Sequence, residues 1–193
     1  MESLFKVFGK HGTLEDSLRD YLVYALRKVE LKKKHPIVTE GKTSKLIGFI
    51  EAGVIRSYRD RRGREMTSWL MSEGDIFVSL RSFFLQEPAT ETIETLKPSI
   101  IHTISFEQYE YIIGNWPSFQ QIRAEILQKY YLLSEQREDM RLQRSDEKYR
   151  FLMKTQPNLV DKVPDKYLAS YLGVSPGTYS RAKHRYAKRN DLK

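Results

Sequence analysis

The sequence of 193 residues contains no cysteine, and this absence excludes several kinds of chemistry. A chain without cysteine forms no disulfide, has no thiolate nucleophile and cannot ligate zinc or an iron–sulfur cluster through sulfur. Long apolar runs are missing as well, since no stretch approaches the roughly 20 residues of a membrane-spanning helix. The N-terminal residues do not combine a basic start with an apolar core, as a secretory signal would. We therefore expect a cytoplasmic protein without a membrane partner.

Histidine is scarce and scattered, which gives no support to a metal site. The four histidines, His11, His35, His102 and His184, show no paired ligand spacing. His102 stands among apolar residues in "SIIHTIS", a setting typical of a hydrogen-bonded structural histidine. We expect no metal and no cofactor.

The excess of positive over negative charge is confined to the C-terminal part of the chain. The protein carries 33 Lys and Arg against 25 Asp and Glu, and residues 141–193 hold 13 basic and 5 acidic residues, which accounts for the whole excess of +8. Residues 1–140 are therefore neutral overall. A basic module joined to a neutral one is the charge distribution expected of a protein that binds a polyanion such as nucleic acid.

Within this basic part, the stretch "DKYLASYLGVSPGTYSRAKH" (165–184) predicts two short helices joined by a tight turn. Gly173 suits the left-handed position that ends a helix. Ser175 can cap the next helix, and Pro176 fits its first position, where the missing amide hydrogen costs nothing. Ala169 supplies the small residue needed where the helices cross. These features indicate a helix-turn-helix motif.

The second helix of this pair presents a basic outward face. Once Leu168, Leu172 and Tyr179 pack inward, polar and basic side chains remain outside. The residues that we expect to contact DNA are Lys166, Ser175, Pro176, Gly177, Thr178, Arg181, His184, Arg185 and Lys188. The alternative is an ordinary helical hairpin with a solvated basic face.

Residues 31–106 change to short apolar and β-branched runs. Gly41, Gly53, Gly63 and Gly74 separate these runs at intervals of 12, 10 and 11 residues. Strands with turn signals at that pitch predict a closed or sandwiched antiparallel sheet. Before it, residues 13–29 carry leucines at helical spacing and predict an amphipathic helix.

A long helix is predicted after the sheet, because 39 residues between Pro117 and Pro157 contain neither Gly nor Pro. Its apolar stripe consists of Phe119, Ile122, Ile126, Tyr130, Leu133 and Met140. The stripe either packs on its own domain or forms a seam between two subunits. Ser145, followed by two acidic residues, predicts a break and a new helix to about Thr155.

The order of these elements resembles the CRP/FNR family of bacterial transcription regulators. The segment "VTEGKTSKLIGFIEAGVIRSYRDRRGREMTSWLMSEGDIF" is similar to that family's β-roll. The resemblance implies an α+β fold with an N-terminal antiparallel β-roll of the double-stranded β-helix (jelly-roll) type, a long dimerisation helix and a C-terminal all-α helix-turn-helix domain. It implies three regions, 1–115, 116–144 and 145–193. It also implies a homodimer on a two-fold symmetric DNA site, with RNA polymerase as a further partner.

The effector region departs from the family pattern. Members that bind cyclic nucleotides use a Gly-Glu-Leu turn for the ribose and an Arg-Ser pair for the cyclic phosphate. This sequence has Val78-Ser79-Leu80 and Ala89-Thr90 at those places, so cyclic AMP is not expected as the effector. The candidate pocket residues are Val78, Ser79, Leu80, Arg81, Ala89 and Thr90. Arg81 or Arg56 could replace the missing arginine, and the sequence identifies no other effector.

The DNA-binding region departs from the family as well. Gly177 has no side chain to read a base, which leaves Arg181 as the main base-reading candidate. The sequence stops soon after this helix, so the family's β-hairpin wing is expected to be reduced or absent. Two rival functions stay open: an interaction module that regulates a partner protein, and a cupin-like enzyme. We expect no enzyme, because no Ser/His/Asp set or His-x-His pattern is found.

Overall fold

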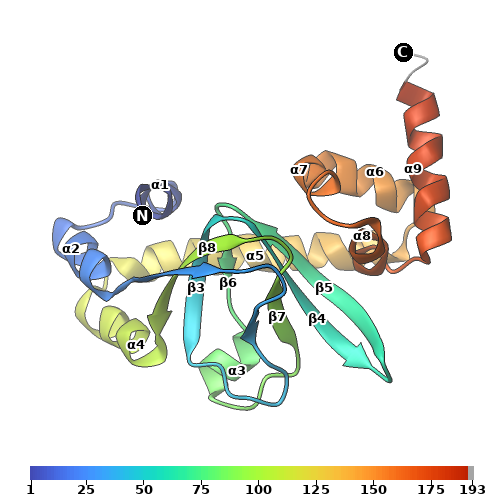
Figure 1. Cartoon of the computed structure of the whole chain (residues 1–193). Coiled ribbons are helices and arrows are strands. Elements are labelled where there is room, and N and C mark those ends of the chain that lie inside the picture. The colour runs from blue at the N-terminus through green and yellow to red at the C-terminus, as the bar shows by residue number, and fades with distance from the viewer. Residues whose placement is uncertain (191–193) are drawn as a thin grey trace.

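The computed structural model describes residues 1–190 and contains an N-terminal β-roll, one long helix and a group of C-terminal helices (Figure 1). Two helices, α1 (Glu2–Phe8) and α2 (Asp16–Ala25), precede the roll. The roll consists of β1 (Arg27–Leu31), β2 (Pro36–Val38), β3 (Leu46–Ala52), β4 (Val54–Arg61), β5 (Arg64–Ser72), β6 (Ile76–Phe77), α3 (Leu80–Leu85), β7 (Thr92–Thr95) and β8 (Ser99–Ser105). After it come α4 (Phe106–Asn115), α5 (Phe119–Leu142), α6 (Ser145–Thr155), α7 (Pro157–Val160), α8 (Asp165–Tyr171) and α9 (Pro176–Asn190).

Two antiparallel four-stranded sheets form the roll, as the glycine spacing predicts. One sheet has the strand order β1-β8-β3-β6, and the other has the order β2-β7-β4-β5. Successive side chains of a strand point to opposite faces, and the buried side chains follow this alternation. Ile50, Ile55, Ile93 and Ile101 face the interior between the sheets and form one core cluster. Phe49, next to Ile50, faces outward and packs against the N-terminal helices.

The predicted turn glycines are confirmed by their backbone angles. Gly41, Gly53, Gly63 and Gly74 have φ values of 84°, 112°, 78° and 89°, a region that other residues seldom adopt. Gly53 has a second constraint, because a Cβ atom there would come within 2.2 Å of the Ser99 side chain. The turn between β3 and β4 therefore requires glycine for both conformation and space.

The helix predicted over residues 13–29 is confirmed for residues 16–25 and wrong for its last four residues. Helix α2 ends at Ala25, and Arg27–Leu31 forms β1, which pairs with β8 from Arg27 opposite Thr103 to Leu31 opposite Ser99. Pairing with β8 therefore outweighs the helical spacing of the leucines where the chain joins the sheet.

The apolar stripe of α5 packs on its own chain. Phe119 and Ile122 are buried against α1, α2 and β3, and Met140 is buried among the C-terminal helices. The Tyr130 hydroxyl accepts a hydrogen bond from the Ile76 amide at 2.8 Å. Phe119, Ile122 and Met140 are therefore engaged within the subunit, whereas Ile126, Tyr130 and Leu133 are only half-buried. A dimer contact through the stripe stays a prediction. Other large apolar side chains on α5 remain exposed: Leu127, Tyr131, Leu132 and Leu142.

The C-terminal helices share a core with the β-roll. Val54 and Leu70 of the roll belong to the same buried cluster as Leu152, Leu168 and Leu172. The break predicted before Ser145 and the helix to Thr155 are confirmed by α6. In Figure 1, α9 stands at the end of the molecule away from the roll. None of the helices in residues 1–190 combines the length and apolar character needed to cross a membrane.

Candidate nucleic-acid interface and effector region

The turn between α8 and α9 has the geometry that its sequence predicts. Gly173 adopts a φ of 64°. Its amide donates to the Ser170 carbonyl at 3.1 Å, and the Val174 amide donates to the Ala169 carbonyl at 3.0 Å. This pair of bonds is the Schellman pattern that closes a helix on a left-handed residue. The chain can therefore reverse direction within a few residues.

Helix α9 starts where the cap predicts and is fixed against its neighbours. Ser175 Oγ accepts a hydrogen bond from the Thr178 amide at 3.2 Å, and Pro176 is the first helical residue. Tyr179 is buried, and its ring meets that of Tyr149 on α6 edge to face at 5.5 Å. Ala182 is buried one turn further on. The orientation of α9 is thus set by α6 and α8.

The solvent-exposed side of α9 carries most of the predicted DNA contacts. Residues at helical spacing along it form what we call the outer face of α9: Gly177, Ser180, Arg181, His184 and Lys188, all exposed. The Arg181 guanidinium donates to Thr178 Oγ1 at 3.3 Å, which directs the arginine along the start of the helix. Ser175 and Pro176 are exposed at its N-terminus, and Lys166 is exposed on α8. Ser180 was missed, although it lies three residues after Gly177 and four before His184.

Arg185 is exposed and lies four residues after Arg181, but its guanidinium is turned toward α6. It binds Asp146, at the start of α6, through contacts of 2.5 Å from Nη2 and 2.9 Å from Nε. This hydrogen-bonded arginine lowers the pKa of Asp146 below its usual value. Arg185 therefore joins α6 to α9, and its charge is already paired within the chain.

The predicted effector-pocket residues do not converge on one cavity. Ser79 and Ala89 are buried and Val78 is half-buried, whereas Leu80 and Thr90 are exposed. Arg81 lies on the surface, where its Nε donates to Glu87 at 2.7 Å. That these six residues line a pocket stays a prediction.

A carboxylate that the sequence analysis missed occupies the interior side of this region. Glu91 accepts hydrogen bonds from Ser57 Oγ at 2.7 Å and from Ser79 Oγ at 3.1 Å. Glu91 comes just before β7 and two residues before Ile93, so its side chain points to the same side as Ile93, into the roll. The alternation of side chains along a strand, counted back from Ile93, could have predicted this position of Glu91. An acidic group thus stands next to Ala89 and Thr90, two of the predicted effector-region residues.

Arg56 is fully buried and faces away from the roll interior. Its Nε donates to Glu94 at 2.8 Å, and its Nη2 contacts Glu65. The guanidinium also lies 4.0 Å from the ring centre of Tyr58 and 4.1 Å from that of Tyr167. Because Tyr167 belongs to α8, Arg56 links the roll to the helix-turn-helix. It is not placed to bind a ligand phosphate.

Further bonds fix α8 on the strands beside Arg56. The Thr67 amide donates to Ser170 Oγ at 2.9 Å, and the same hydroxyl donates to the Glu65 carbonyl at 3.1 Å. Lys34 binds Glu94 at 2.7 Å, and its ammonium lies 4.7 Å from the Tyr167 ring centre. Strands β4 and β5 and helix α8 therefore form one hydrogen-bonded junction.

His102 is a structural residue, as its apolar setting predicts. It is buried on β8, and its Nε2 hydrogen-bonds to Glu51 on β3. Together with Lys28, this contact lowers the pKa of Glu51 to about 2. Across residues 1–190, no group of histidine and acidic side chains is arranged to hold a metal ion.

Comparison with known proteins matches the roll to one domain family. Residues 28–115 match the family model described as the cyclic nucleotide-binding domain. No individual curated protein sequence matches the chain.

Solved structures confirm the CRP/FNR fold over most of the chain. FixK2 from Bradyrhizobium japonicum is 16% identical with a TM-score of 0.73, covering 86% of each chain. The c-di-GMP-responsive global regulator CLP of Xanthomonas campestris is 12% identical with a TM-score of 0.70, covering 91% of this chain and 93% of its own. A CooA mutant from Carboxydothermus hydrogenoformans is 18% identical with a TM-score of 0.67, covering 87% of this chain and 79% of its own. The β-roll is thus followed by the long helix and C-terminal helices of this fold. The family's wing would follow α9, and residues 191–193 lie outside the described part.

Replacing Arg56 should uncouple the β-roll from α8. Arg56→Ala leaves the buried Glu94 with Lys34 alone and removes the guanidinium from the Tyr167 ring, so we expect a loss of about 3 kcal/mol in unfolding free energy. Arg59→Ala, at an exposed position three residues along the same strand, is the control and should change stability by less than about 0.5 kcal/mol. Urea denaturation of both variants measures this difference. Equal stability of the two variants would contradict the role assigned to Arg56.

Proposed function

We propose that the chain is a bacterial transcriptional regulator of the CRP/FNR type, which binds duplex DNA through α9 as a homodimer in the cytoplasm. The observation that carries this proposal is the outer face of α9, which is basic, exposed and held in place by a capped helix-turn-helix. The regulators with the same fold support it. The proposal assigns no catalytic activity to the chain.

The outer face of α9 has groups suited to both parts of DNA recognition. Arg181 can bind the O6 and N7 atoms of guanine with two hydrogen bonds, the commonest specific contact in the major groove. Ser175 and Thr178, at the N-terminus of α9, suit phosphate contacts, where the helix dipole favours negative charge. Lys188, near the other end, suits a phosphate further along the duplex. Gly177 allows the backbone to approach the groove closely.

A second copy of the chain would complete the site. We place the dimer contact on the exposed apolar residues of α5, namely Leu127, Tyr131 and Leu132, since part of the earlier stripe is engaged within the subunit. A two-fold arrangement along α5 would present two α9 helices to two half-sites of one palindromic sequence. RNA polymerase is the further partner that this type of regulator implies.

The proposed effector is not a cyclic nucleotide, despite the family of the roll. Losing the charge-assisted contacts to the phosphate costs about 1.5 to 3 kcal/mol each, and Glu91 adds a like charge nearby. Arg56 and Arg81 are both paired with carboxylates elsewhere. Regulation then rests on another small molecule or on the amount of protein alone.

Calorimetric titration with cyclic AMP and cyclic GMP tests the effector proposal. We expect no binding with a dissociation constant below about 10 µM, because that affinity needs nearly 7 kcal/mol from a pocket without a free cation. If cyclic AMP binds more tightly than this, Arg81→Ala and Arg56→Ala identify which arginine supplies the phosphate contact. Such binding would refute the proposal.

DNA binding is tested with duplexes selected from a random pool and measured by fluorescence anisotropy. Arg181→Ala should lower the binding free energy by about 1 to 3 kcal/mol and relax the preference at one base position. Lys188→Ala should weaken binding to all sequences alike and reduce the salt dependence of binding. Arg150→Ala on α6, exposed and outside the outer face, is the control and should leave binding nearly unchanged. If Arg181→Ala binds every sequence as tightly as the parent chain, α9 does not read the bases.

A further inference from the structure

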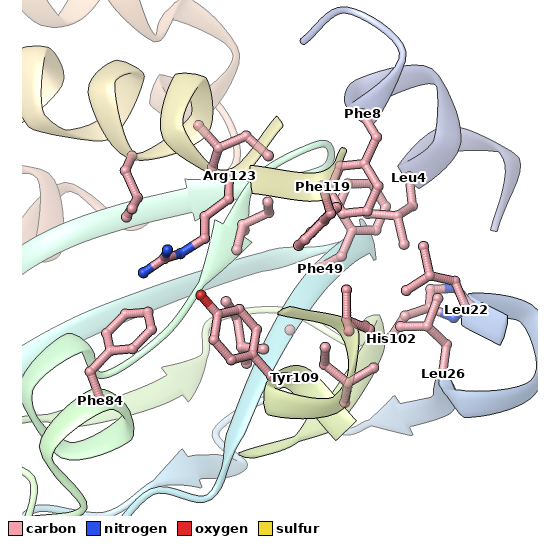
Figure 2. A pocket seen from close by; sticks show the side chains of 17 residues that line it. Leu4, Phe8, Leu22, Leu26, Phe49, Phe84, His102, Tyr109, Phe119 and Arg123 are labelled. Atoms are coloured by element: carbon pink, nitrogen blue, oxygen red, sulfur yellow. The ribbon is translucent and has the colours of Figure 1, made fainter. Parts of the chain in front are cut away.

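The cavity under the N-terminal helices has almost wholly apolar walls (Figure 2). Its basic side chains have partners within the chain, because His102 is bound to Glu51 and Arg123 Nη1 donates to Gln120 Oε1 at 3.1 Å. The cavity therefore contains no group that would select a ligand. The unpaired charges of the roll lie elsewhere, on the surface.

The end of the β4–β5 hairpin is a basic ribbon that the proposed DNA contacts on α9 leave unused. Residues 59–66, which we call the hairpin tip, are all exposed and include Arg59, Arg61, Arg62 and Arg64. None of these four arginines forms an ion pair within residues 1–190. Figure 1 shows the hairpin extending past α8, with its end away from the rest of the roll. The overall neutrality of residues 1–140 therefore conceals a local concentration of unpaired positive charge.

The two acidic residues of the hairpin tip do not neutralise these arginines. The Asp60 carboxylate accepts a hydrogen bond from the Gly63 amide at 2.7 Å and closes the turn. The Glu65 carboxylate binds the buried Arg56 at the junction with α8. Asp60 and Glu65 lie directly opposite each other across the hairpin, so their side chains share one face of the ribbon.

The other face of the hairpin tip carries three of the arginines. Arg61 lies directly opposite Arg64, and Arg59 comes two residues before Arg61, so all three side chains point the same way. Arg62 and Gly63 fix this register, because their φ values of 56° and 78° are both positive, as a two-residue type I′ turn requires. Like charges directly opposite each other destabilise a strand pair. A bound anion would relieve the repulsion between Arg61 and Arg64.

We infer that the hairpin tip binds phosphate groups of the DNA that flanks the half-site read by α9. This inference rests on the proposed function, which brings a duplex to the C-terminal helices. The composition of the hairpin tip favours nucleic acid over an acidic protein. It contains no aromatic residue and one apolar residue, Met66, whereas protein interfaces depend on buried aromatic and other large anchors. Interfaces with DNA are more polar and much more positively charged.

The hairpin is joined firmly to the helices that hold α9. The Arg56 guanidinium lies 4.1 Å from the ring centre of Tyr167 on α8, and the Thr67 amide donates to Ser170 Oγ on the same helix at 2.9 Å. The strand from Arg56 to Arg61 covers about 17 Å at the ordinary rise per residue. This reach equals roughly five base pairs of duplex, so ten additional base pairs beside a half-site are long enough to include the contact.

Fluorescence anisotropy with two duplexes tests the inference without any variant. The short duplex is the sequence selected for α9, ending at the outer ends of its two half-sites, and the long duplex adds ten unrelated base pairs on each side. The parent chain should bind the long duplex about tenfold more tightly at about 100 mM salt, with a steeper salt dependence, because more phosphates are neutralised. Equal affinity for the two duplexes would overturn the inference.

Paired variants then locate the contact. Arg61→Gln/Arg64→Gln should bind the short duplex as the parent does, lose the added affinity for the long duplex and reduce the salt slope by about 2. Lys6→Gln/Lys10→Gln removes the same charge from exposed residues at the N-terminal end and should retain the added affinity. The inference is also overturned if the arginine variant retains it, or if the hairpin tip binds poly-glutamate and not the flanking DNA. A parent chain that binds neither duplex would overturn the proposed function as well, so the two failures are distinguishable.

Discussion

A buried guanidinium joins the two halves of this molecule. Arg56 leaves β4 on the face opposite the roll core, binds Glu94 and Glu65, and lies between the rings of Tyr58 and Tyr167. Because Tyr167 belongs to α8, this contact determines where the helix-turn-helix sits on the roll. The orientation of α9 follows from it through the Schellman turn at Gly173 and the buried Tyr179. The outer face of α9 is directed to solvent because the inner faces of both helices are already occupied.

The charges at the junction between the roll and the helices are paired, whereas those on the outer face of α9 are open to solvent. Carboxylates within the chain neutralise the cations at the junction and on the flank of α9, as Asp146 does for Arg185. The outer face retains its positive charge, which a polyanion can neutralise with release of counterions. In the roll, the interior has an acidic group at Glu91, which accepts hydrogen bonds from Ser57 and Ser79. The interior of the roll and the outer face of α9 therefore differ in charge.

Local signals in the sequence were sufficient to predict the roll and the helix-turn-helix. The turns at Gly53 and Gly173 need backbone angles that glycine supplies, so spacing alone predicts them. Tertiary contacts decided the rest. Residues 27–29 fall within the predicted helix but pair with β8. Phe119 and Ile122 pack on α1 and β3, which the stripe could not distinguish from a second subunit. The roles of Arg56 and Glu91 depend on which strand face each occupies and on partners far along the chain, so no short motif marks them.

The central claim is that α9 is the element that contacts DNA. Backbone amide chemical shifts of the full chain, recorded while duplex DNA is added, test this most directly because they report on every element at once. The account predicts that the largest changes lie in residues 175–188, with small changes in the β4–β5 turn. Changes concentrated at the exposed arginines of that turn, Arg59, Arg61, Arg62 and Arg64, with none in α9, would contradict it.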